Sequence, residues 1–377
     1  MFIDRISVEN YRNYTSLDIQ LSNDVNIFYG NNGQGKTNLL EALYYNVIGK
    51  SFRNTKDHDI IRKDSDKDCF EISTHISDDI TETIYIKYNK NKEKFIKVNG
   101  LYLRKIGHLM GSVLAVIFSP EDMQLISEGP SIRRKFMDIA ISQIKASYYF
   151  DLLQYNKILV QKNNLIRNIK YDKSKNYGDI LSVWNEQLAS AGAKIILERA
   201  QLIDKLGASA ADKHSGIAVD SAEKNEILSL SYKSDISREI IESNDVNRIK
   251  DELFKLSESR REKEIEREMS LYGPHRDDID FKLNDNDLKR FGSQGQKRTA
   301  ILSVKMAELE IIEKASGRKP VLILDDVLSE LDDKRQKSFL CGIDNVQTFI
   351  SCTEIDSIDI KNRGAEFFKI KNGHVEL

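Results

Sequence analysis

The chain has 377 residues, a net charge of −2 and a pI near 6.4, so no global positive field attracts it to nucleic acid or to an anionic membrane. Its three Cys and six His are scattered, which excludes a disulfide framework and a zinc site. No leader of basic and apolar residues and no apolar run of about 20 residues is present. We therefore expect a soluble protein of the reducing cytoplasm.

Residues 2–29 alternate apolar and polar side chains, which predicts strands, the last of them ending at Gly30. Residues 38–45 predict a helix, because good helix formers carry apolar side chains at spacings of three and four. Residues 69–104 alternate again and contain the turn signal Asn99-Gly100, which predicts antiparallel strands. This order indicates an α/β fold with a β-rich subdomain.

The middle of the chain has the periodicity of helices. The pattern covers 131–208 and resumes at 247–269, where the helix is highly charged. The polar segments 170–178 and 209–226 predict loops. We expect these helices to form an arm inserted into the α/β part.

After residue 290 the pattern of an α/β fold returns. It predicts helices at 297–314 and 333–341 and strands at 321–324 and 348–350. We therefore predict a discontinuous head of residues 1–120 plus 272–377, with 121–271 as the inserted helical arm.

A phosphate-binding loop is predicted between the strand that ends near residue 29 and the following helix. Its residues match G-x-x-x-x-G-K-[ST] and are Gly30, Asn31, Asn32, Gly33, Gln34, Gly35, Lys36 and Thr37. The glycines let backbone N–H groups converge on phosphate oxygens at a helix N-terminus. Lys36 would supply charge to the β- and γ-phosphates of ATP, and Thr37 a hydroxyl to Mg²⁺. An ordinary glycine turn is the alternative, which the flanking strand and helix disfavour.

The apolar strand at 321–324 ends in paired carboxylates, Asp325 and Asp326. In a nucleotide hydrolase Asp325 would hold Mg²⁺, and Asp326 would polarise the attacking water. Apolar strands often end in Asp where a loop begins. This element therefore indicates a nucleotide hydrolase only in combination with the glycine loop. We predict Asp326 and Lys36 as the catalytic pair.

The segment around Ser293 resembles the signature motif of ATP-binding-cassette proteins, with Ser293, Gly295 and Gln296 at the matching positions. Free N–H groups at a helix N-terminus make an anion site, and in this superfamily the motif completes the γ-phosphate pocket of the opposite protomer. Residues 329–332 resemble the D-loop of the same superfamily. Taken alone, an ordinary Ser/Gly/Gln helix cap is equally consistent with the residues at 293–296.

The spacing of 257 residues between Lys36 and Ser293 separates the subfamilies. Transporter ATPase subunits place these motifs closer together, and SMC proteins insert a far longer coiled coil. The intermediate spacing resembles that of the RecF family. Four further stretches carry this resemblance, and they are Asn10-Tyr11-Arg12-Asn13-Tyr14, Phe118-Ser119-Pro120-Glu121-Asp122, Gly129-Pro130-Ser131-Ile132-Arg133-Arg134-Lys135-Phe136-Met137-Asp138 and Tyr272-Gly273-Pro274-His275-Arg276-Asp277-Asp278.

The resemblance implies an ATP-binding-cassette head, built from a P-loop NTPase sheet and an antiparallel β subdomain, with an inserted helical arm. It also implies a cytoplasmic, nucleoid-associated factor of DNA repair, replication and the SOS response, with a weak, DNA-stimulated ATPase. Such a protein dimerises on ATP with Mg²⁺, binds single-stranded and duplex DNA at gap junctions and, with RecO and RecR, promotes RecA loading. Two departures from the wider superfamily are Asp326 in place of Glu and Ser351 or Thr353 in place of the usual switch His.

For DNA binding, residues 145–175 are the most basic part of the helical region. Lysines on an exposed helix neutralise phosphates without reading sequence. We predict contacts from Lys157, Lys162 and Arg167, with a solvated helix face as the alternative. The alternative functions are the energising subunit of a membrane transporter and an SMC-like structural organiser, and the length of the insertion disfavours both.

Overall fold

The computed structural model describes residues 1–53, 55–78, 81–171, 177–218, 226–328, 331, 335–336, 339–340, 342–343, 345–354 and 364–376. The chain divides into two compact units. Unit 1 comprises Met1–Met123, Ser209–Ile227 and Ser293–Leu377, and unit 2 comprises Gln124–Ala208 and Leu228–Gly292. Among the described helices, none combines the length and the apolar character needed to span a membrane.

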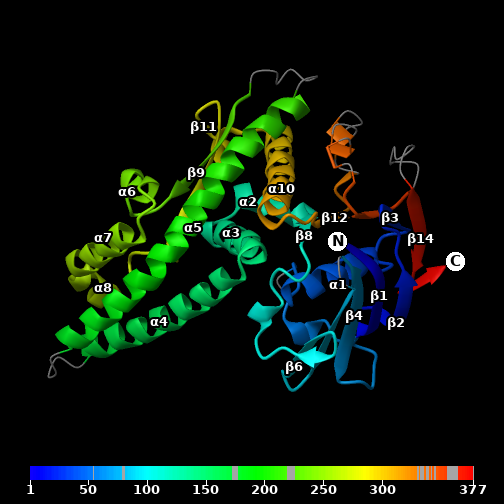
Figure 1. The fold of residues 1–377 in the computed structure, drawn as a ribbon, viewed down its shortest axis with the longest axis horizontal. Helices are drawn as coiled ribbons and strands as arrows, with labels where there is room; N and C mark the ends of the chain where they lie inside the picture. Colours follow the sequence, from blue (N-terminus) through cyan, green and yellow to red (C-terminus); the bar gives the residue numbers. More distant parts are fainter. Residues whose placement is uncertain are drawn as a thin grey trace. The chain divides into compact units, whose positions relative to one another are not determined.

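Unit 1 contains a six-stranded, mostly parallel sheet in the order β15-β14-β3-β13-β12-β8 (Figure 1). The strands are β3 (Val25–Tyr29), β8 (Ala115–Phe118), β12 (Val321–Asp325), β13 (Thr348–Cys352), β14 (Ala365–Lys371) and β15 (His374–Glu376), of which only β15 is antiparallel to its neighbour. β8, β12 and β13 are buried along their whole length, as expected for parallel strands covered on both faces. The helix α10 (Gln294–Ser316) packs against β8.

The second sheet of unit 1 is antiparallel, in the order β2-β1-β4-β5-β6-β7. Its strands are β1 (Phe2–Tyr11), β2 (Tyr14–Gln20), β4 (Cys69–Ser77), β5 (Glu82–Asn89), β6 (Lys94–Val98) and β7 (Leu101–Tyr102). Buried and partly exposed side chains alternate along β4, so the sheet has one inner and one outer face. The β6–β7 hairpin turns at Asn99 and Gly100, whose φ values of 50° and 77° suit a type I′ turn.

Helix α1 (Lys36–Ile48) contacts both sheets of unit 1. It touches β12 and β13 of the parallel sheet and β1, β4 and β5 of the antiparallel one, and it is buried from Leu39 to Ile48. A helix buried on all sides needs apolar residues on all sides. Asn46, a polar exception, donates a hydrogen bond of 3.1 Å to the Thr74 hydroxyl in β4. Short 3-10 helices complete the unit, at Asp57–Asp59, Ile106–His108 and Pro120–Met123.

Unit 2 is mainly helical. Its helices are α2 (Gln124–Ser127), α3 (Pro130–Ile144), α4 (Ala146–Tyr171), α6 (Arg238–Glu242), α7 (Val246–Ser259), α8 (Arg261–Arg267) and α9 (Leu288–Phe291), together with most of α5 (Gly178–Ala218). A small sheet in the order β11-β10-β9 joins β9 (Leu228–Lys233), β10 (Asp278–Leu283) and β11 (Asn286–Asp287). The predicted single helix at 247–269 is broken at Arg260, whose guanidinium pairs with Asp235 at 2.9 Å and donates to the Leu271 carbonyl at 2.9 Å.

The observed division shifts the first predicted boundary only from 120 to 123, but it differs more widely in two other places. Residues 209–218, predicted as a loop, continue α5 and group with unit 1, where Ser209 and Lys213 each contact the Glu310 carboxylate at 3.0 Å. Residues 272–292, predicted in the head, group with unit 2 because β10 pairs with β9 and packs on α3. Of the predicted helix at 333–341, only 335–336 and 339–340 are described, and both pairs are helical.

A buried polar network joins the helices of unit 2. The Arg199 guanidinium, 2% exposed, contacts the Asp138 carboxylate at 2.8 and 3.1 Å and donates to the Pro274 carbonyl at 2.6 Å. Arg133 forms a second guanidinium–carboxylate pair with Asp278, 2.9 Å at one of its contacts. Each buried charge therefore has an opposite charge and further hydrogen bonds, without which its desolvation would destabilise the unit.

Two titratable groups in the loop before β10 are shifted in opposite directions by this burial. His275 Nδ1 lies 2.6 Å from the Tyr155 hydroxyl, and burial lowers the pKa of His275 from 6.5 to about 4. Asp277 accepts a hydrogen bond from the Tyr232 hydroxyl, but burial still raises the pKa of Asp277 from 3.8 to about 6. Both groups are therefore mainly neutral in the folded unit near pH 5.

We predict that these two groups give opposing pH dependences. Asp277 contributes stability below pH 4 that is lost as the pH rises through 6, whereas His275 loses stability as the pH falls from 6.5 towards 4. In His275→Gln only the Asp277 dependence remains. The free energy of unfolding of this variant, relative to the parent, should therefore fall by about 3 kcal/mol between acidic and neutral pH. Asp277→Asn should give the opposite trend. Urea unfolding across this pH range checks both, and parallel pH profiles for the two variants would contradict the prediction.

Candidate phosphate-binding site

The glycine loop connects the end of β3 to the N-terminus of α1. Gly30, Gly33 and Gly35 have positive φ values of 140°, 79° and 119°. A Cβ at Gly30 would lie 2.5 Å from the carbonyl oxygen of Ile370, and one at Gly35 would lie 2.6 Å from the Asn13 amide nitrogen. At these two positions only glycine satisfies both the backbone conformation and the available space.

Three hydrogen bonds from outside the loop hold Gln34 in place. The Asn13 amide (2.8 Å) and the backbone N–H of Gly373 (3.0 Å) both donate to the Gln34 carbonyl oxygen. The backbone N–H of Asn372 donates to the Gln34 side-chain oxygen at 2.8 Å. A loop carbonyl that would repel an anion is thereby turned towards protein donors. No role was predicted for Asn13, although it lies in one of the stretches that carry the family resemblance.

Lys36 is the first residue of α1 and is only 4% exposed. Its ammonium group donates to the carbonyl oxygens of Gly30 (2.7 Å) and Asn31 (3.1 Å), so it is folded back over the loop. The positive charge and the N-terminus of α1 act in the same direction, because the helix dipole also favours an anion there. The arrangement suits phosphate, which helix N-termini of this kind bind through their N–H groups.

An acidic pair lies beside Thr37. The Thr37 hydroxyl donates to Asp325 Oδ1 at 2.8 Å, although the two residues are 288 positions apart. Between β3 and β12 lies β13, and Ser351 near its end donates to the same oxygen at 2.8 Å. Ser351 also accepts the backbone N–H of Asp326 at 2.9 Å. The hydroxyl of Ser351 thus joins both carboxylate residues.

Burial raises the pKa of Asp325 above its usual value, although the hydrogen bonds from Ser351 and Thr37 oppose the rise. A cation at this carboxylate would favour its charged form. Asp326 follows with a φ of 53°, a left-handed conformation that Asp adopts more readily than most residues. The bend places Asp326 beyond the end of the strand, at the sheet edge that carries the loop.

The donor set near Thr37 suits Mg²⁺. Hydroxyl and carboxylate oxygens are hard ligands, and Mg²⁺ is usually held by one or two carboxylates together with phosphate oxygens and water. Across the described residues no group of three or more His, Cys, Asp and Glu side chains forms a metal site. The residues therefore fit a Mg²⁺ ion that binds together with a phosphate rather than one held by protein ligands alone.

A surface hollow of about 410 Å³ lies beside the loop. Its lining residues are Arg12, Asn13, Asn38, Asp59, Ile61, Arg62, Lys63 and Asp64. Arg12 donates two hydrogen bonds, of 2.8 and 2.7 Å, to the buried Glu41 carboxylate of α1. Asn13 accepts a hydrogen bond of 2.8 Å from the Asn38 amide. The turn between β1 and β2 is thereby tied to both the loop and its helix.

Ser293, Gly295 and Gln296 form the N-terminus of α10. Ser293 is its N-cap in a capping box, in which its hydroxyl accepts the Gln296 N–H at 3.2 Å and Gln296 Oε1 accepts the Ser293 N–H at 2.7 Å. Gln296 Nε2 donates to Glu226, a partner that the sequence did not indicate. Within the described part of the chain, no hydrogen bond joins these three residues to the glycine loop. The described residues thus show no hydrogen bond between the two predicted halves of the nucleotide site.

The predicted DNA-binding residues on α4 differ in exposure. Lys157 and Arg167 are exposed, but Lys162 is completely buried, so its prediction as a DNA contact is wrong. Its ammonium lies 2.8 Å from the buried Glu264 carboxylate and 4.3 Å from the centre of the Tyr272 ring. Burial lowers the pKa of Lys162, and the charge of Glu264 opposes that shift. Lys162 therefore joins α4 to α8 and is closed to solvent.

Some predicted residues lie outside those that the structure describes. Of the D-loop at 329–332, only Leu331 is described. Lys173 and Lys175, in the basic stretch at 145–175, also lie outside the described residues. Lys145 pairs with Glu198, and Lys170 pairs with Glu268.

Comparison with known proteins places the chain in a family. Residues 2–374 match the family described as RecF/RecN/SMC N terminal domain. The chain is 41% identical over 368 residues to the DNA replication and repair protein RecF of Acetivibrio thermocellus, covering 98% of this chain and 97% of that one. It is 42% identical over 379 residues to the protein of the same name from Clostridium botulinum strain Loch Maree, covering both chains completely.

Solved structures agree with these sequence matches. A recombination mediator protein RecF of the RecFOR pathway, named RecF-ATPrS, superposes with a TM-score of 0.90 at 38% identity over 100% of this chain and 97% of that one. An SMC head domain derived from Pyrococcus furiosus gives a TM-score of 0.54 at 13% identity over 100% and 95% of the two chains, which shows a shared fold. The predicted fold class, an ATP-binding-cassette head with an inserted helical arm, is confirmed. With matches of this identity over its whole length, the chain belongs to the RecF family of DNA replication and repair proteins.

Proposed function

We propose that this chain is an ATP-dependent DNA-binding factor of recombinational repair that dimerises on ATP and hydrolyses it slowly. The observation that carries the proposal is the contact of 2.8 Å between the Thr37 hydroxyl and the Asp325 carboxylate, which brings the end of the glycine loop to the acidic pair. A solved relative of 38% identity is named RecF-ATP. That name and the loop geometry support ATP as the ligand.

Different residues around the loop would hold the phosphates, the Mg²⁺ ion and the attacking water. The N–H groups of Gly33 to Lys36 and the Lys36 ammonium would bind the phosphates, and Thr37 with Asp325 would hold Mg²⁺, which neutralises phosphate charge when bound. Asp326 would orient and polarise the attacking water, with Ser351 holding its backbone. Ser351 stands where the wider superfamily has a switch His. Unlike His, a serine hydroxyl does not exchange a proton near neutral pH, and this supports slow turnover.

The resemblance of Ser293, Gly295 and Gln296 to a signature motif supports ATP-dependent dimerisation. Ser293 is exposed and caps α10, whose N-terminus favours an anion. In the superfamily that this motif resembles, it completes the γ-phosphate pocket of the opposite protomer, so a nucleotide held by the glycine loop would meet the Ser293 of a second copy. Closure of the dimer would then depend on the γ-phosphate.

The cellular role is proposed from the relatives. Proteins named for DNA replication and repair, and one named for the RecFOR pathway, support a cytoplasmic, nucleoid-associated factor. It would act at single-strand gaps and junctions with RecO and RecR to promote RecA loading, and would serve replication and the SOS response.

The first prediction tests nucleotide binding. Lys36→Ala should weaken ATP binding about 100-fold or more, because it removes the buried charge placed against the phosphates. Isothermal titration with ATP and Mg²⁺ measures the change, and exposed Lys50→Ala is the matched control. Equal ATP affinity in Lys36→Ala and the parent would rule out the loop as the site.

The second prediction separates binding from hydrolysis. Asp326→Asn should bind ATP like the parent yet hydrolyse it about 100-fold or more slowly, because Asn tolerates the left-handed backbone but polarises water poorly. Phosphate release measures the rate. Asp326→Glu, which restores a carboxylate, should retain measurable turnover. If the Asn variant hydrolyses ATP at the parent rate, Asp326 has no such role.

The third prediction concerns the dimer. Ser293→Arg should bind ATP as a monomer but fail to dimerise, because the guanidinium fills the γ-phosphate position at the N-terminus of α10. Sedimentation with and without ATP measures this. Ser293→Ala removes the cap, at a cost of about 1 kcal/mol in stability, without adding bulk and should still dimerise. Parent-like dimerisation of Ser293→Arg would contradict the proposal.

A further inference from the structure

We propose that the outer face of β5, β6 and β7 binds single-stranded nucleic acid, with bases stacked on exposed aromatic rings and phosphates held by neighbouring cations. The inference rests on the proposed DNA-binding function and gives it a surface and a preferred substrate. It also moves the main contact away from α4, where Lys162 is buried and Lys145 and Lys170 are already paired.

The strand register alternates aromatic and basic side chains on this face. Tyr85 of β5 stands opposite Lys97 of β6, which stands opposite Tyr102 of β7, and Lys87 stands opposite Phe95. The intervening residues face the other way and are buried, namely Ile84, Ile86 and Ile96. The pleat therefore presents Tyr85, Phe95 and Tyr102 together with the two lysines on the side away from α1.

The rings on this face are accessible. Phe95 is 37% exposed and Tyr102 is 63% exposed, and their ring centres lie 6.4 Å apart in a T-shaped arrangement. The Lys97 ammonium lies 4.6 Å from the centre of the Tyr102 ring and 5.6 Å from that of Tyr85. β7 is the edge of its sheet and only two residues long, so nothing beyond it in the sheet covers Tyr102.

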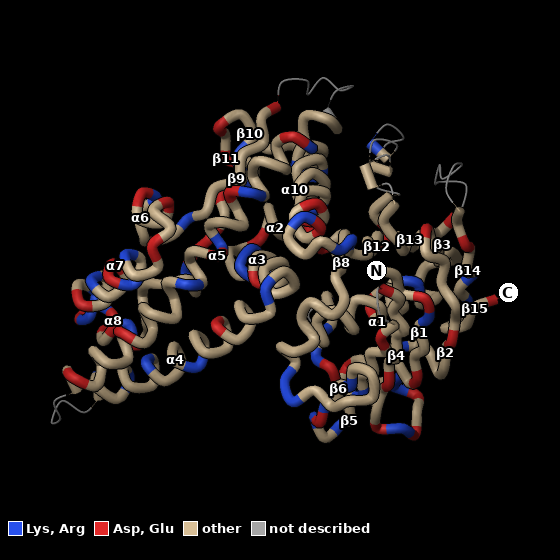
Figure 2. The backbone as a smooth tube through the Cα atoms, viewed as in Figure 1, with Lys and Arg blue, Asp and Glu red and all other residues tan. Residues whose placement is uncertain are grey.

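The charge of the segment matches a polyanion. Residues 87–105 contain seven Lys or Arg and a single Glu, a net charge of +6 in a chain whose total is −2. In Figure 2 blue segments, which mark Lys and Arg, lie along β5 and β6. Of these cations, Lys87, Lys90 and Lys94 pair with Glu71, Asp68 and Asp57. Lys92, Lys97 and Arg104 form no ion pair with any residue that the structure describes, and they are the cations available to phosphates.

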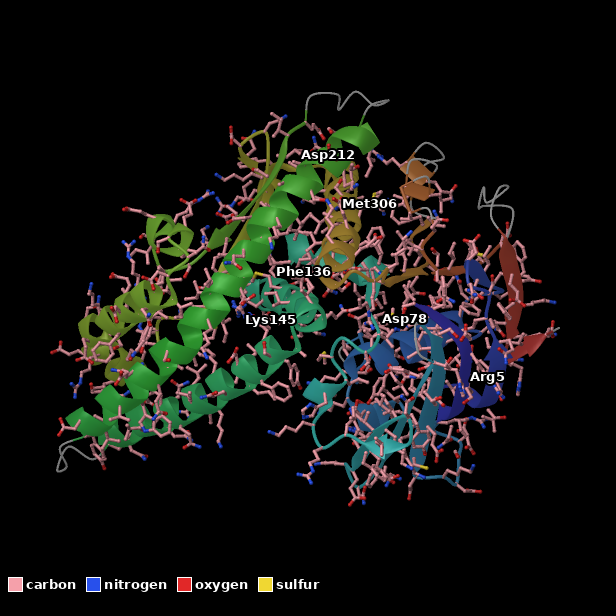
Figure 3. The ribbon with its side chains drawn as sticks, viewed as in Figure 1. Arg5, Asp78, Phe136, Lys145, Asp212 and Met306 are labelled. Carbon is pink, nitrogen blue, oxygen red and sulfur yellow. The ribbon has the colours of Figure 1, made fainter. Side chains whose placement is uncertain are left out.

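The other half of the same outer face differs. Its charges cancel in ion pairs, such as Arg5 (labelled in Figure 3) with Asp18 and Lys67 with Glu9. A hollow of about 310 Å³ there is lined by Glu9, Asp18 and Glu71 among others. Because Glu9, Asp18 and Glu71 are paired with Lys67, Arg5 and Lys87, these pairs offer a polyanion no net positive charge, unlike the unpaired cations Lys92, Lys97 and Arg104.

Exposed rings beside cations on an open sheet favour single strands over duplex. Bases in a duplex are stacked on each other and offer only their edges, whereas unpaired bases stack on aromatic side chains. Stacking is tolerant of sequence, which suits a protein that acts wherever a strand is unpaired. Duplex DNA would gain only the phosphate contacts of the lysines.

The test compares variants of the full-length protein by fluorescence anisotropy. The probes are a labelled oligothymidylate, longer than the roughly 4–16 nucleotides of such a site, and a duplex of equal length. The double variant Phe95→Ala/Tyr102→Ala should bind the single strand roughly tenfold or more weakly, with a smaller change for duplex. Tyr102→Phe keeps the ring and should bind like the parent.

A second variant tests the charges. Lys92→Gln/Lys97→Gln/Arg104→Gln should lower the slope of log K against log salt by about two for the single strand. The comparison variant on the arm, Lys157→Gln/Arg167→Gln/Tyr171→Ala, removes two exposed cations and an exposed ring at the alternative surface and should weaken single-strand binding less than the charge variant does.

The outcomes are distinguishable. Parent-like single-strand binding by both the aromatic and the charge variant overturns this inference while leaving DNA binding intact, as does a loss confined to the arm variant. A parent that binds neither probe, with or without ATP, overturns the proposed function as well. If the double-alanine variant does not fold, the charge variant still decides the matter.

Discussion

Helix α1 is packed against both sheets of unit 1, and this packing fixes the position of the glycine loop. The helix is buried from Leu39 to Ile48, so its N-terminus, with Lys36 and Thr37, cannot shift without disturbing two hydrophobic contacts. Glu41 is a buried carboxylate in this mainly apolar helix, and it requires the Arg12 guanidinium as its partner. That pair draws the β1–β2 turn against the helix, and the turn carries the Asn13 amide that holds the loop.

The elements that sequence predicts well are those with a local cause. The glycine pattern, the apolar run of β12 and the alternation of β4 each follow from one segment's own backbone and burial. The continuation of α5 through 209–218 has no such cause, because Ser209 is held by Glu310, a residue 101 positions away. The misplaced boundary at 272–292 has the same origin, since the pairing of β10 with β9 crosses the whole of α6 to α8.

The residues of the site can be divided in the same way, into those with a local cause and those supplied by distant segments. Positions 30–37 and the acidic pair are visible in sequence because backbone conformation and strand ends demand particular residues there. The parts supplied from elsewhere, such as Ser351 between the two carboxylates and Glu226 on the signature motif, are chemically ordinary residues whose partners are set by the fold. Lys162 resembles the solvated lysines of the same helix in sequence, and only the burial of Glu264 beside it distinguishes it.

The C-terminal strands are synthesised last, and the phosphate site is complete only once they have folded. β3 forms early in the chain, but its two neighbours, β13 and β14, and the Asn372–Gly373 turn that holds Gln34 come last. Gln34 and Asn372 are 338 positions apart, which a ribosome covers in roughly 20–70 s at 5–20 residues per second. During that interval the nascent glycine loop has Asn13 but lacks the hydrogen bonds from Asn372 and Gly373 and both strand neighbours of β3. A chain still attached to the ribosome, or one cut short before residue 365, therefore holds no finished phosphate site.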